Sequence, residues 1–127
     1  MEYLTLEEVY LLHERLIQQT SGSRGLRDPE SLESGVARPQ ASSGGEDRYP
    51  SVWLKAAALM HGLMKSPPFV DGNKRTAVTA MGVFLELNGC LLTADNEDLL
   101  CLALEVAAKE IEPPEVAEWL RRYSPCR

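Results

Sequence analysis

Apolar residues recur at helical spacing along most of this chain, and that pattern limits its fold more than any other feature. In residues 5–19, leucine, valine and isoleucine repeat every three or four positions, which places them on one face of a helix. Comparable apolar stripes run through residues 51–65, 74–89 and 94–110. Only residues 90–93 are a candidate for a short extended piece. The pattern predicts an all-α protein with almost no strand.

Capping residues and breakers divide the apolar stripes into separate helices. Thr5 and Glu8 have the spacing of a capping box at the start of the first helix. Asp28 followed by Pro29 is an N-cap with proline at the first helical position, and it opens a short helix over residues 29–38. About six helices result, with further boundaries at Pro39, Pro50, Pro67-Pro68, Asn88-Gly89 and Pro113-Pro114.

Length and charge narrow the class of protein. A chain of 127 residues suits one domain spanning residues 1–127 with a core of its own. The formal net charge of −6 disfavours general binding to nucleic acid or to anionic membranes, because both repel such a field. The acidic, helical start does not resemble a signal peptide, and no apolar run approaches the ~20 residues of a membrane span. We therefore expect a cytoplasmic protein.

The three cysteines, Cys90, Cys101 and Cys126, are far apart and lack zinc-binding spacing. An odd number of cysteines without such spacing indicates a reducing compartment. Cys101 lies in an apolar run and is predicted to fill the core.

The segment QASSGGEDRYP, residues 40–50, is a long Gly/Ser-rich loop for so small a domain. Loops of this kind are either functional lids or mobile connections. The sequence leaves both interpretations open.

The stretch KSPPFVDGNKRTA carries the residues with the clearest chemistry. Asn73 lies where a loop enters the N-terminus of a very apolar helix, whose unpaired backbone N–H groups attract anions. Gly72 allows the loop to bend so that several N–H groups converge. Lys74 and Arg75 add positive charges that suit phosphate oxygens. The stretch is therefore a candidate phosphate site.

Two more residues of the stretch complete this interpretation. Asp71 places a carboxylate beside the phosphate site, as a Mg²⁺ ion bridging protein and nucleotide requires. Phe69 is predicted to insert into the core and hold the loop. The plain alternative is an Asp-Gly turn followed by solvated Lys and Arg side chains, and the local residues do not decide between the two.

The stretch PFVDGNKRTA resembles the signature loop of the Fic/Doc superfamily, which reads H-x-F-x-(D/N)-(A/G)-N-K-R in the Doc branch. The likeness covers nearly the whole chain and implies an all-helical bundle with this loop between two central helices. It also implies ATP as a substrate, together with Mg²⁺. Other segments resemble Doc (death-on-curing) proteins in the expected order: YLTLEEVYLLHERLI, LRDPESLESGVARPQ, GGEDRYPSVWLKAAALMHGLMK, FLELNG and AEWLRR.

The resemblance implies a role for each residue of the loop. Phe69 anchors the loop, and Asp71 binds the metal. The phosphates of ATP are implied to contact four residues, of which Arg75 also counts as catalytic: Gly72, Asn73, Lys74 and Arg75.

Two positions separate the Doc branch from the adenylylating Fic branch, which reads G-N-G-R-x-x-R after the acid. Lys74 occupies the place of the second glycine and fills space that an extra phosphate would use. Val78 stands where the last arginine would be. Both changes resemble the Doc branch, which transfers the terminal phosphoryl group of ATP to a protein hydroxyl. Adenylyl transfer is the alternative.

The resemblance implies two protein partners. Doc proteins are toxins that modify a threonine of the elongation factor EF-Tu and so stop translation. Each is paired with an antitoxin, Phd, whose disordered C-terminal segment folds as a helix in a groove near the active site. In this chain RDPESLESGVARPQ and the Gly/Ser-rich loop are candidates for part of that groove.

Pro67 departs from the family pattern. It occupies the position of the catalytic histidine, two residues before Phe69, which in the family takes a proton from the incoming hydroxyl. Proline has no side-chain base, and the neighbouring Ser66 is no base at neutral pH. His61 is expected to be a packed helix residue, and His13 a surface or groove residue. The chain is predicted to bind phosphate and metal but to lack its catalyst.

The loss of the histidine has more than one explanation. The chain is either a natural pseudo-enzyme or the product of an acquired or deliberate inactivation of a toxic gene. A further alternative is a catalytically dead module that keeps only its partner-binding groove.

Overall fold

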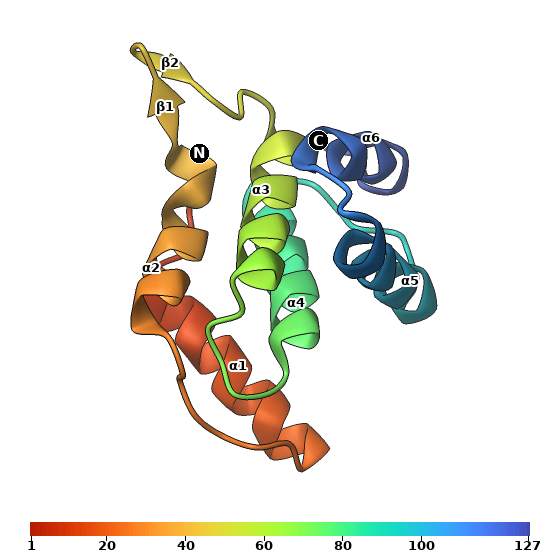
Figure 1. Ribbon diagram of the computed structural model, residues 1–127. Helices are drawn as coiled ribbons and strands as arrows, with labels where there is room; N and C mark the ends of the chain where they lie inside the picture. The colour runs from red at the N-terminus through yellow and green to blue at the C-terminus, as the bar shows by residue number, and fades with distance from the viewer.

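Six α-helices form nearly all of the regular structure in the computed structural model, which describes residues 1–127 (Figure 1). A 3-10 helix, η1 (Arg38–Gln40), continues the second helix, and β1 (Ser42–Ser43) pairs antiparallel with β2 (Glu46–Asp47). The predicted all-α fold is confirmed, and no helix is long and apolar enough to cross a membrane. The helices are α1 (Leu6–Thr20), α2 (Pro29–Ala37), α3 (Val52–Lys65), α4 (Asn73–Leu87), α5 (Asn96–Lys109) and α6 (Pro113–Tyr123).

Local capping explains where the first helices begin and end. The Thr5 hydroxyl accepts from the Glu8 backbone N–H at 3.1 Å, and the Thr5 N–H donates to Glu8 Oε1 at 2.9 Å, so the predicted capping box is present. Asp28 caps α2 by accepting from the Ser31 N–H. Pro39 does not end this segment directly, because it sits within η1, whose first turn does not use the missing N–H.

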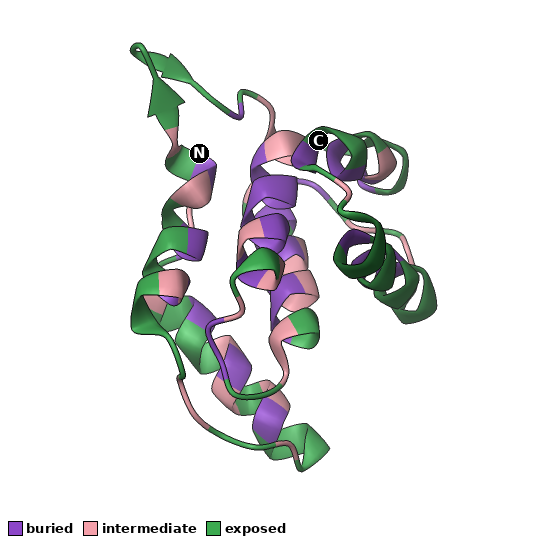
Figure 2. Cartoon of the chain, in the orientation of Figure 1, coloured by how far each residue is buried: buried purple, intermediate pink, exposed green.

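Helices α3 and α4 lie side by side at the centre of the molecule and carry most of the fully buried residues (Figure 2). Three consecutive alanines of α3, residues 56–58, are completely buried, as are Ala77 and Ala80 of α4. Their small side chains let neighbouring helices approach closely. In Figure 1, α1 and α2 flank this pair on one side and α5 and α6 on the other. All six helices contribute to one hydrophobic core.

The Gly/Ser-rich segment folds into the β1–β2 hairpin, which lies before the N-terminus of α3. The signature loop follows the C-terminus of the same helix, about 20 Å away at 1.5 Å per residue (Figure 1). The hairpin therefore does not lie over that loop, and the lid interpretation is wrong for this arrangement. Its strands are exposed, yet it is not free of the body of the protein.

A buried lysine ties the hairpin to α3. Lys55 is 2% exposed, and its Nζ donates to both carboxylate oxygens of Asp47 at 2.9 Å and to the Pro39 carbonyl at 3.1 Å. Burial alone lowers the pKa of Lys55, but the hydrogen bond to Asp47 and the nearby Tyr3 outweigh it, so the pKa is raised. The ammonium stays charged because its partners are in place.

The C-terminal tail folds back along residues 89–93. The Leu91 N–H donates to the Pro125 carbonyl at 3.0 Å, and Cys90 and Cys126 lie directly opposite each other and form a disulfide. The expected extended piece at 90–93 thus pairs with the tail. The inference of a reducing compartment from the cysteine count and spacing does not predict this disulfide, because its two partners are 36 residues apart and meet only in the folded chain. Cys101 is exposed on α5, so its predicted place in the core is wrong.

Candidate functional site

The loop of residues 66–72 joins the two central helices and is fixed to the chain that follows α1. The Arg27 and Asp28 N–H groups both donate to the Pro68 carbonyl, at 2.8 and 2.9 Å. The Val70 N–H donates to the Gly25 carbonyl at 3.0 Å. These bonds hold the loop as if it were the edge of a small sheet. The backbone of the loop is therefore held in a single conformation.

Two side chains hold the loop from within. Phe69 is 1% exposed and lies in the main core, where an anchor would lie. The Asn73 amide bridges back across the loop: its Oδ1 accepts from the Phe69 N–H and its Nδ2 donates to the Phe69 carbonyl, both at 2.9 Å. Asn73 is thus occupied in shaping the loop, and its backbone rather than its side chain is left for a ligand.

His13 of α1 supports the loop from below, which sequence reasoning missed. It is 1% exposed, its ring stacks on Phe69 with centroids 3.6 Å apart, and its Nε2 lies 2.8 Å from the Asp71 carbonyl oxygen. The expectation of a surface or groove residue is wrong, because the side chain is buried beneath the loop. The sequence does indicate the burial of His13, because Val9, His13 and Ile17 are four residues apart and share one face of the helix.

The N-terminus of α4 presents free backbone donors beside two cations. The N–H groups of Asn73, Lys74 and Arg75 have no acceptor, and the N-cap is Gly72, which has no side chain to cap them. Gly72 has φ +77°, a conformation that other residues rarely adopt. The side chains of Lys74 and Arg75 are exposed and form no ion pair. An anion at this position is attracted both by the dipole of α4 and by the charges of Lys74 and Arg75.

Asp71 sits at the rim of these donors with its carboxylate already oriented. Its Oδ1 accepts from the Gly72 N–H at 2.9 Å and its Oδ2 accepts from the Ser23 N–H at 3.1 Å. The residue is exposed, and each carboxylate oxygen keeps a second lone pair. No cluster of three metal-binding side chains exists in the molecule. A single carboxylate fits Mg²⁺, which keeps waters and takes its other oxygens from substrate phosphates.

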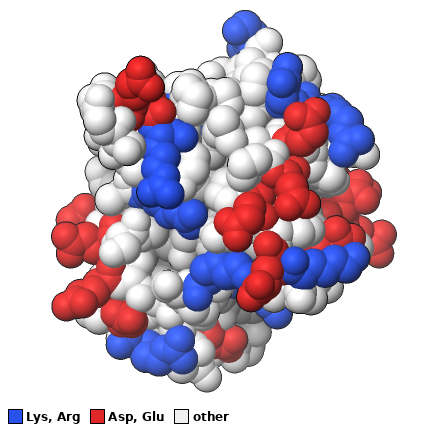
Figure 3. Space-filling view, turned by 45° about the horizontal axis from the view of Figure 1, so that its top comes forward, with Lys and Arg blue, Asp and Glu red and all other residues white.

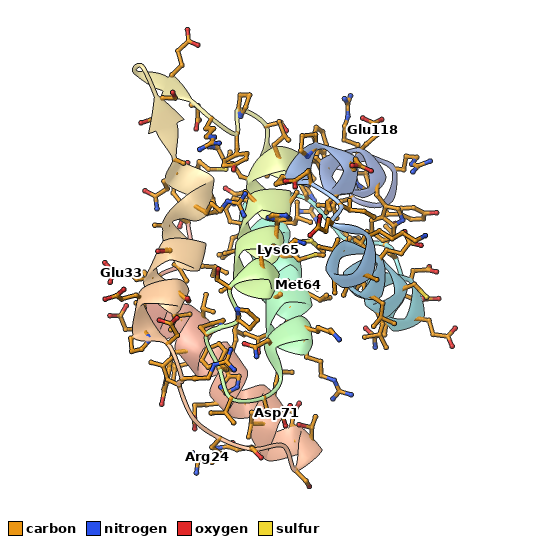
Figure 4. The ribbon with its side chains drawn as sticks, viewed as in Figure 1. Arg24, Glu33, Met64, Lys65, Asp71 and Glu118 are labelled. Atoms are coloured by element: carbon orange, nitrogen blue, oxygen red, sulfur yellow. A yellow bond between two sulfur atoms is a disulfide. The ribbon has the colours of Figure 1, made fainter.

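These groups face one cleft of about 450 Å³. In Figure 4 Met64 lies near the end of α3 and Asp71 lies in the loop, so the cleft opens between the end of α3, the start of α4 and α5. The charged groups come from the loop and the first turn of α4, and apolar groups come from α3, α5 and the loop itself. The lining residues are Met64, Pro67, Val70, Asp71, Gly72, Asn73, Lys74, Arg75, Leu100 and Ala107.

Pro67 lines this cleft, and no histidine does. Its carbonyl accepts from the Arg27 guanidinium at 3.0 Å, so its backbone is held in place. His13 contacts the loop but is enclosed under it, and His61 lies among other partners. The structure therefore brings the predicted phosphate-binding residues together around a position that has no proton acceptor.

His61 is buried on α3 away from the cleft. Arg38 donates to its Nδ1 at 2.6 Å, and its Nε2 lies 3.7 Å from Glu112. Burial lowers the pKa of His61 below its ordinary value, and the positive charge of Arg38 lowers it further. The expectation of a packed helix residue holds, and the hydrogen-bond partner of the ring is the Arg38 guanidinium.

The lowered pKa makes stability depend on pH. The unfolded chain binds the proton more tightly than the folded protein, so the free energy of unfolding should fall as pH drops through about 6.5 and level off below the folded-state pKa. Urea unfolding at pH 7.5 and 5.5 measures this loss, and His61→Gln should make it smaller. An equal loss in both proteins would show that His61 does not cause it.

Comparisons with known proteins identify the family of this chain. The Fic/DOC family model matches residues 3–85, which include α1, the loop and most of α4. The chain is 42% identical over 108 residues to "Toxin Doc" of Mycolicibacterium smegmatis, covering 81% of each chain. It is 31% identical over 122 residues to "Protein kinase doc" of Escherichia phage P1, covering 96% of this chain and 95% of that protein. The chain therefore belongs to the Fic/DOC family.

Proposed function

We propose that this chain is the toxin of a toxin–antitoxin pair, built to transfer the terminal phosphoryl group of ATP to a protein hydroxyl, and that Pro67 disables the transfer. One observation carries the proposal: the free N–H groups at the start of α4, two unpaired cations and an exposed carboxylate face a single cleft. Both curated relatives are Doc proteins, one of them named a kinase.

Different residues of the cleft would bind Mg²⁺ and the phosphates of ATP. Lys74, Arg75 and the free N–H groups would bind phosphate oxygens. Asp71 would take the metal, with its carboxylate held in direction by Ser23 and Gly72. ATP supplies the phosphoryl group, and Mg²⁺ offsets the charge of its phosphates. Met64, Leu100 and Ala107 form an apolar wall of the cleft.

The surroundings of α4 favour phosphoryl transfer over adenylyl transfer. Val78, which stands in place of the second arginine of the Fic pattern, lines a hollow of about 370 Å³ whose lining is half apolar, with Leu16 and Leu99 beside it. Val78 itself offers no charged clamp for an additional phosphate, and the two cations of this hollow, Lys74 and Arg75, also line the cleft. The Lys74 side chain occupies the rim between this hollow and the cleft. Adenylyl transfer remains the second candidate and is distinguished by which phosphate of ATP reaches the target.

The same hollow supports an antitoxin partner. It continues along α4 as a second hollow of about 320 Å³ and shares Val78, Thr79, Asn96 and Leu99 with it. An amphipathic helix laid along this groove would bury its apolar face there. Lys74 and Arg75 stand at one end and would pair with an acidic side chain of that helix. These two hollows lie against α4 and α5. The surface predicted from the sequence has a smaller hollow of about 130 Å³, lined by Ser31, Ser34 and Gly35 of α2.

Surface charge fits a protein target. In Figure 3 Lys and Arg side chains are interspersed with Asp and Glu on the face shown, and no broad basic patch covers it. The net charge of −6 also opposes binding to nucleic acid. By the family resemblance the target is a threonine of EF-Tu in the cytoplasm, with inhibition of translation as the result.

Binding of ATP tests the proposal without requiring catalysis. Isothermal titration with ATP and Mg²⁺ should show binding to the chain as written. Lys74→Ala and Arg75→Ala should each weaken it about 10–100-fold, because a hydrogen bond to a charged group contributes roughly 1.5–3 kcal/mol. Arg122→Ala, an exposed arginine of α6, is the matched control and should leave affinity unchanged. If the chain and its Pro67→His variant both fail to bind, the kinase proposal fails.

A further inference from the structure

His13 makes contacts that reach beyond packing. We propose that His13 is a positioning residue, which sets the direction of the Asp71 carbonyl and thereby the arrangement of the phosphate-binding loop. The inference rests on the proposed function, because it states that His13 of α1 contributes to the affinity of that site for nucleotide. His13 does not line the cleft, so any influence on a ligand passes through the loop.

The surroundings of the His13 ring determine which of its two nitrogens carries a hydrogen. The Asp71 carbonyl oxygen, 2.8 Å from Nε2, can only accept, so Nε2 carries the hydrogen and donates it. The other nitrogen, Nδ1, is buried and has no hydrogen-bond partner. A hydrogen on Nδ1 would be a buried donor without an acceptor, which is costly. The ring therefore carries a hydrogen on Nε2 and donates it to the Asp71 carbonyl.

The peptide after Asp71 carries the effect into the cleft. Because a peptide unit is planar, fixing the Asp71 carbonyl toward α1 also fixes the Gly72 N–H, which points the other way. That N–H donates to Asp71 Oδ1 at 2.9 Å, so the same peptide orients the carboxylate proposed to hold the metal. One hydrogen bond from His13 thus constrains both the carboxylate and the first residue of the phosphate-binding turn.

Packing from α1 leaves this peptide little room to move. A Cβ atom on Gly72 would lie 3.0 Å from Ile17 Cδ1 and 3.7 Å from the His13 ring, so the helix lies directly against the turn. The ring also covers Phe69 at an interplanar angle of 4°. A side chain of similar bulk without a donor would preserve this packing but not the bond to the carbonyl. The two roles of His13 are separable by substitution.

Two substitutions separate the roles. His13→Gln keeps a donor near the place of Nε2, and His13→Leu keeps apolar bulk without a donor. The dissociation constant of Mg²⁺-ATP should rise about tenfold in the leucine variant, the size expected for one lost hydrogen bond, and less than about threefold in the glutamine variant. Val9→Ala, a core change on the same helix, should lower the melting temperature without changing affinity. Equal affinity in the native and leucine proteins overturns the inference.

A measurement without nucleotide separates this inference from the proposed function. Nitrogen-15 NMR of the native protein should show His13 as the tautomer with hydrogen on Nε2. The Gly72 amide resonance should shift in His13→Leu and return toward its native position in His13→Gln. If the native chain binds no ATP, these spectra still decide the positioning role. A Gly72 amide unchanged in the leucine variant, or hydrogen on Nδ1, would contradict it.

Discussion

Replacing Pro67 by histidine is expected to raise the rate of γ-phosphoryl transfer at least about 10²–10⁴-fold above that of the chain as written, which is the usual contribution of a general base. Pro67 lines the cleft that contains Asp71, Lys74 and Arg75. An imidazole in its place has a proton acceptor facing the space where a hydroxyl would meet the terminal phosphate. Proline offers no such group.

The local backbone should accept the change. The Pro67 carbonyl accepts from Arg27, and a histidine at this position keeps that carbonyl. The residue lies just beyond the end of α3 and is partly exposed, so the added N–H can be hydrated. The loop on its far side is held by Pro68 and Phe69, which do not change. The variant should therefore fold as the original chain does.

A transfer assay with labelled ATP measures the effect. The chain as written, Pro67→His and Pro67→Ala are each mixed with Mg²⁺, bacterial extract and ATP labelled at the γ-phosphate, with α-labelled ATP in parallel. Only the histidine variant should label a protein band, and only from the γ position. Label from the α position would show adenylyl transfer. No label in any variant, with ATP binding intact, would favour a module that only binds a partner.

Reduction of the Cys90–Cys126 disulfide is expected to lower the free energy of unfolding by about 4 kcal/mol. The two cysteines are 36 residues apart, and in the chain-entropy view a cross-link of that length restricts the unfolded chain by roughly this amount. The enclosed loop contains α5 and α6 complete. Breaking it should free the tail at Cys126 while the pairing of Leu91 with Pro125 still resists opening.

Denaturant unfolding with and without a reducing agent measures the contribution. The double variant Cys90→Ser/Cys126→Ser should match the reduced protein. Cys101→Ser is the control, because Cys101 is exposed and unpaired. Reduction should lower the free energy of unfolding of this variant as much as that of the original chain. Equal stability of the oxidised and reduced proteins would show that the bond is absent or adds nothing.

Helix boundaries could be predicted from the sequence because their causes are local. The capping box of Thr5 and Glu8 needs only residues three apart, and the free N–H groups after Gly72 follow from a glycine before an apolar helix. The same reasoning placed Lys74 and Arg75 beside each other at the start of α4. Their sharing of one cleft with Asp71 followed from their closeness in the chain.

Two of the missed features depend on contacts between distant segments. His13 meets Asp71 across 58 residues, and Cys90 meets Cys126 across 36, so no local pattern shows either contact. The hairpin had a local signal that was overlooked. Gly44 and Gly45 are a two-residue Gly-Gly connection with positive φ, which is typical of a tight hairpin turn. Its polar, two-residue strands gave no apolar alternation to reveal it.

The ion pair between buried Lys55 and exposed Asp47 has a consequence for how this chain can be extended. The ion pair holds the hairpin at Asp47 of β2, the strand that precedes α3, and makes no contact with the turn at its tip. A Cβ atom on Gly44 or Gly45 would meet no atom within 4 Å. Foreign sequence grafted between these glycines would cost little closure entropy and would project from the end of α3 remote from the cleft. An affinity handle placed there leaves both the cleft and the groove along α4 open to partners.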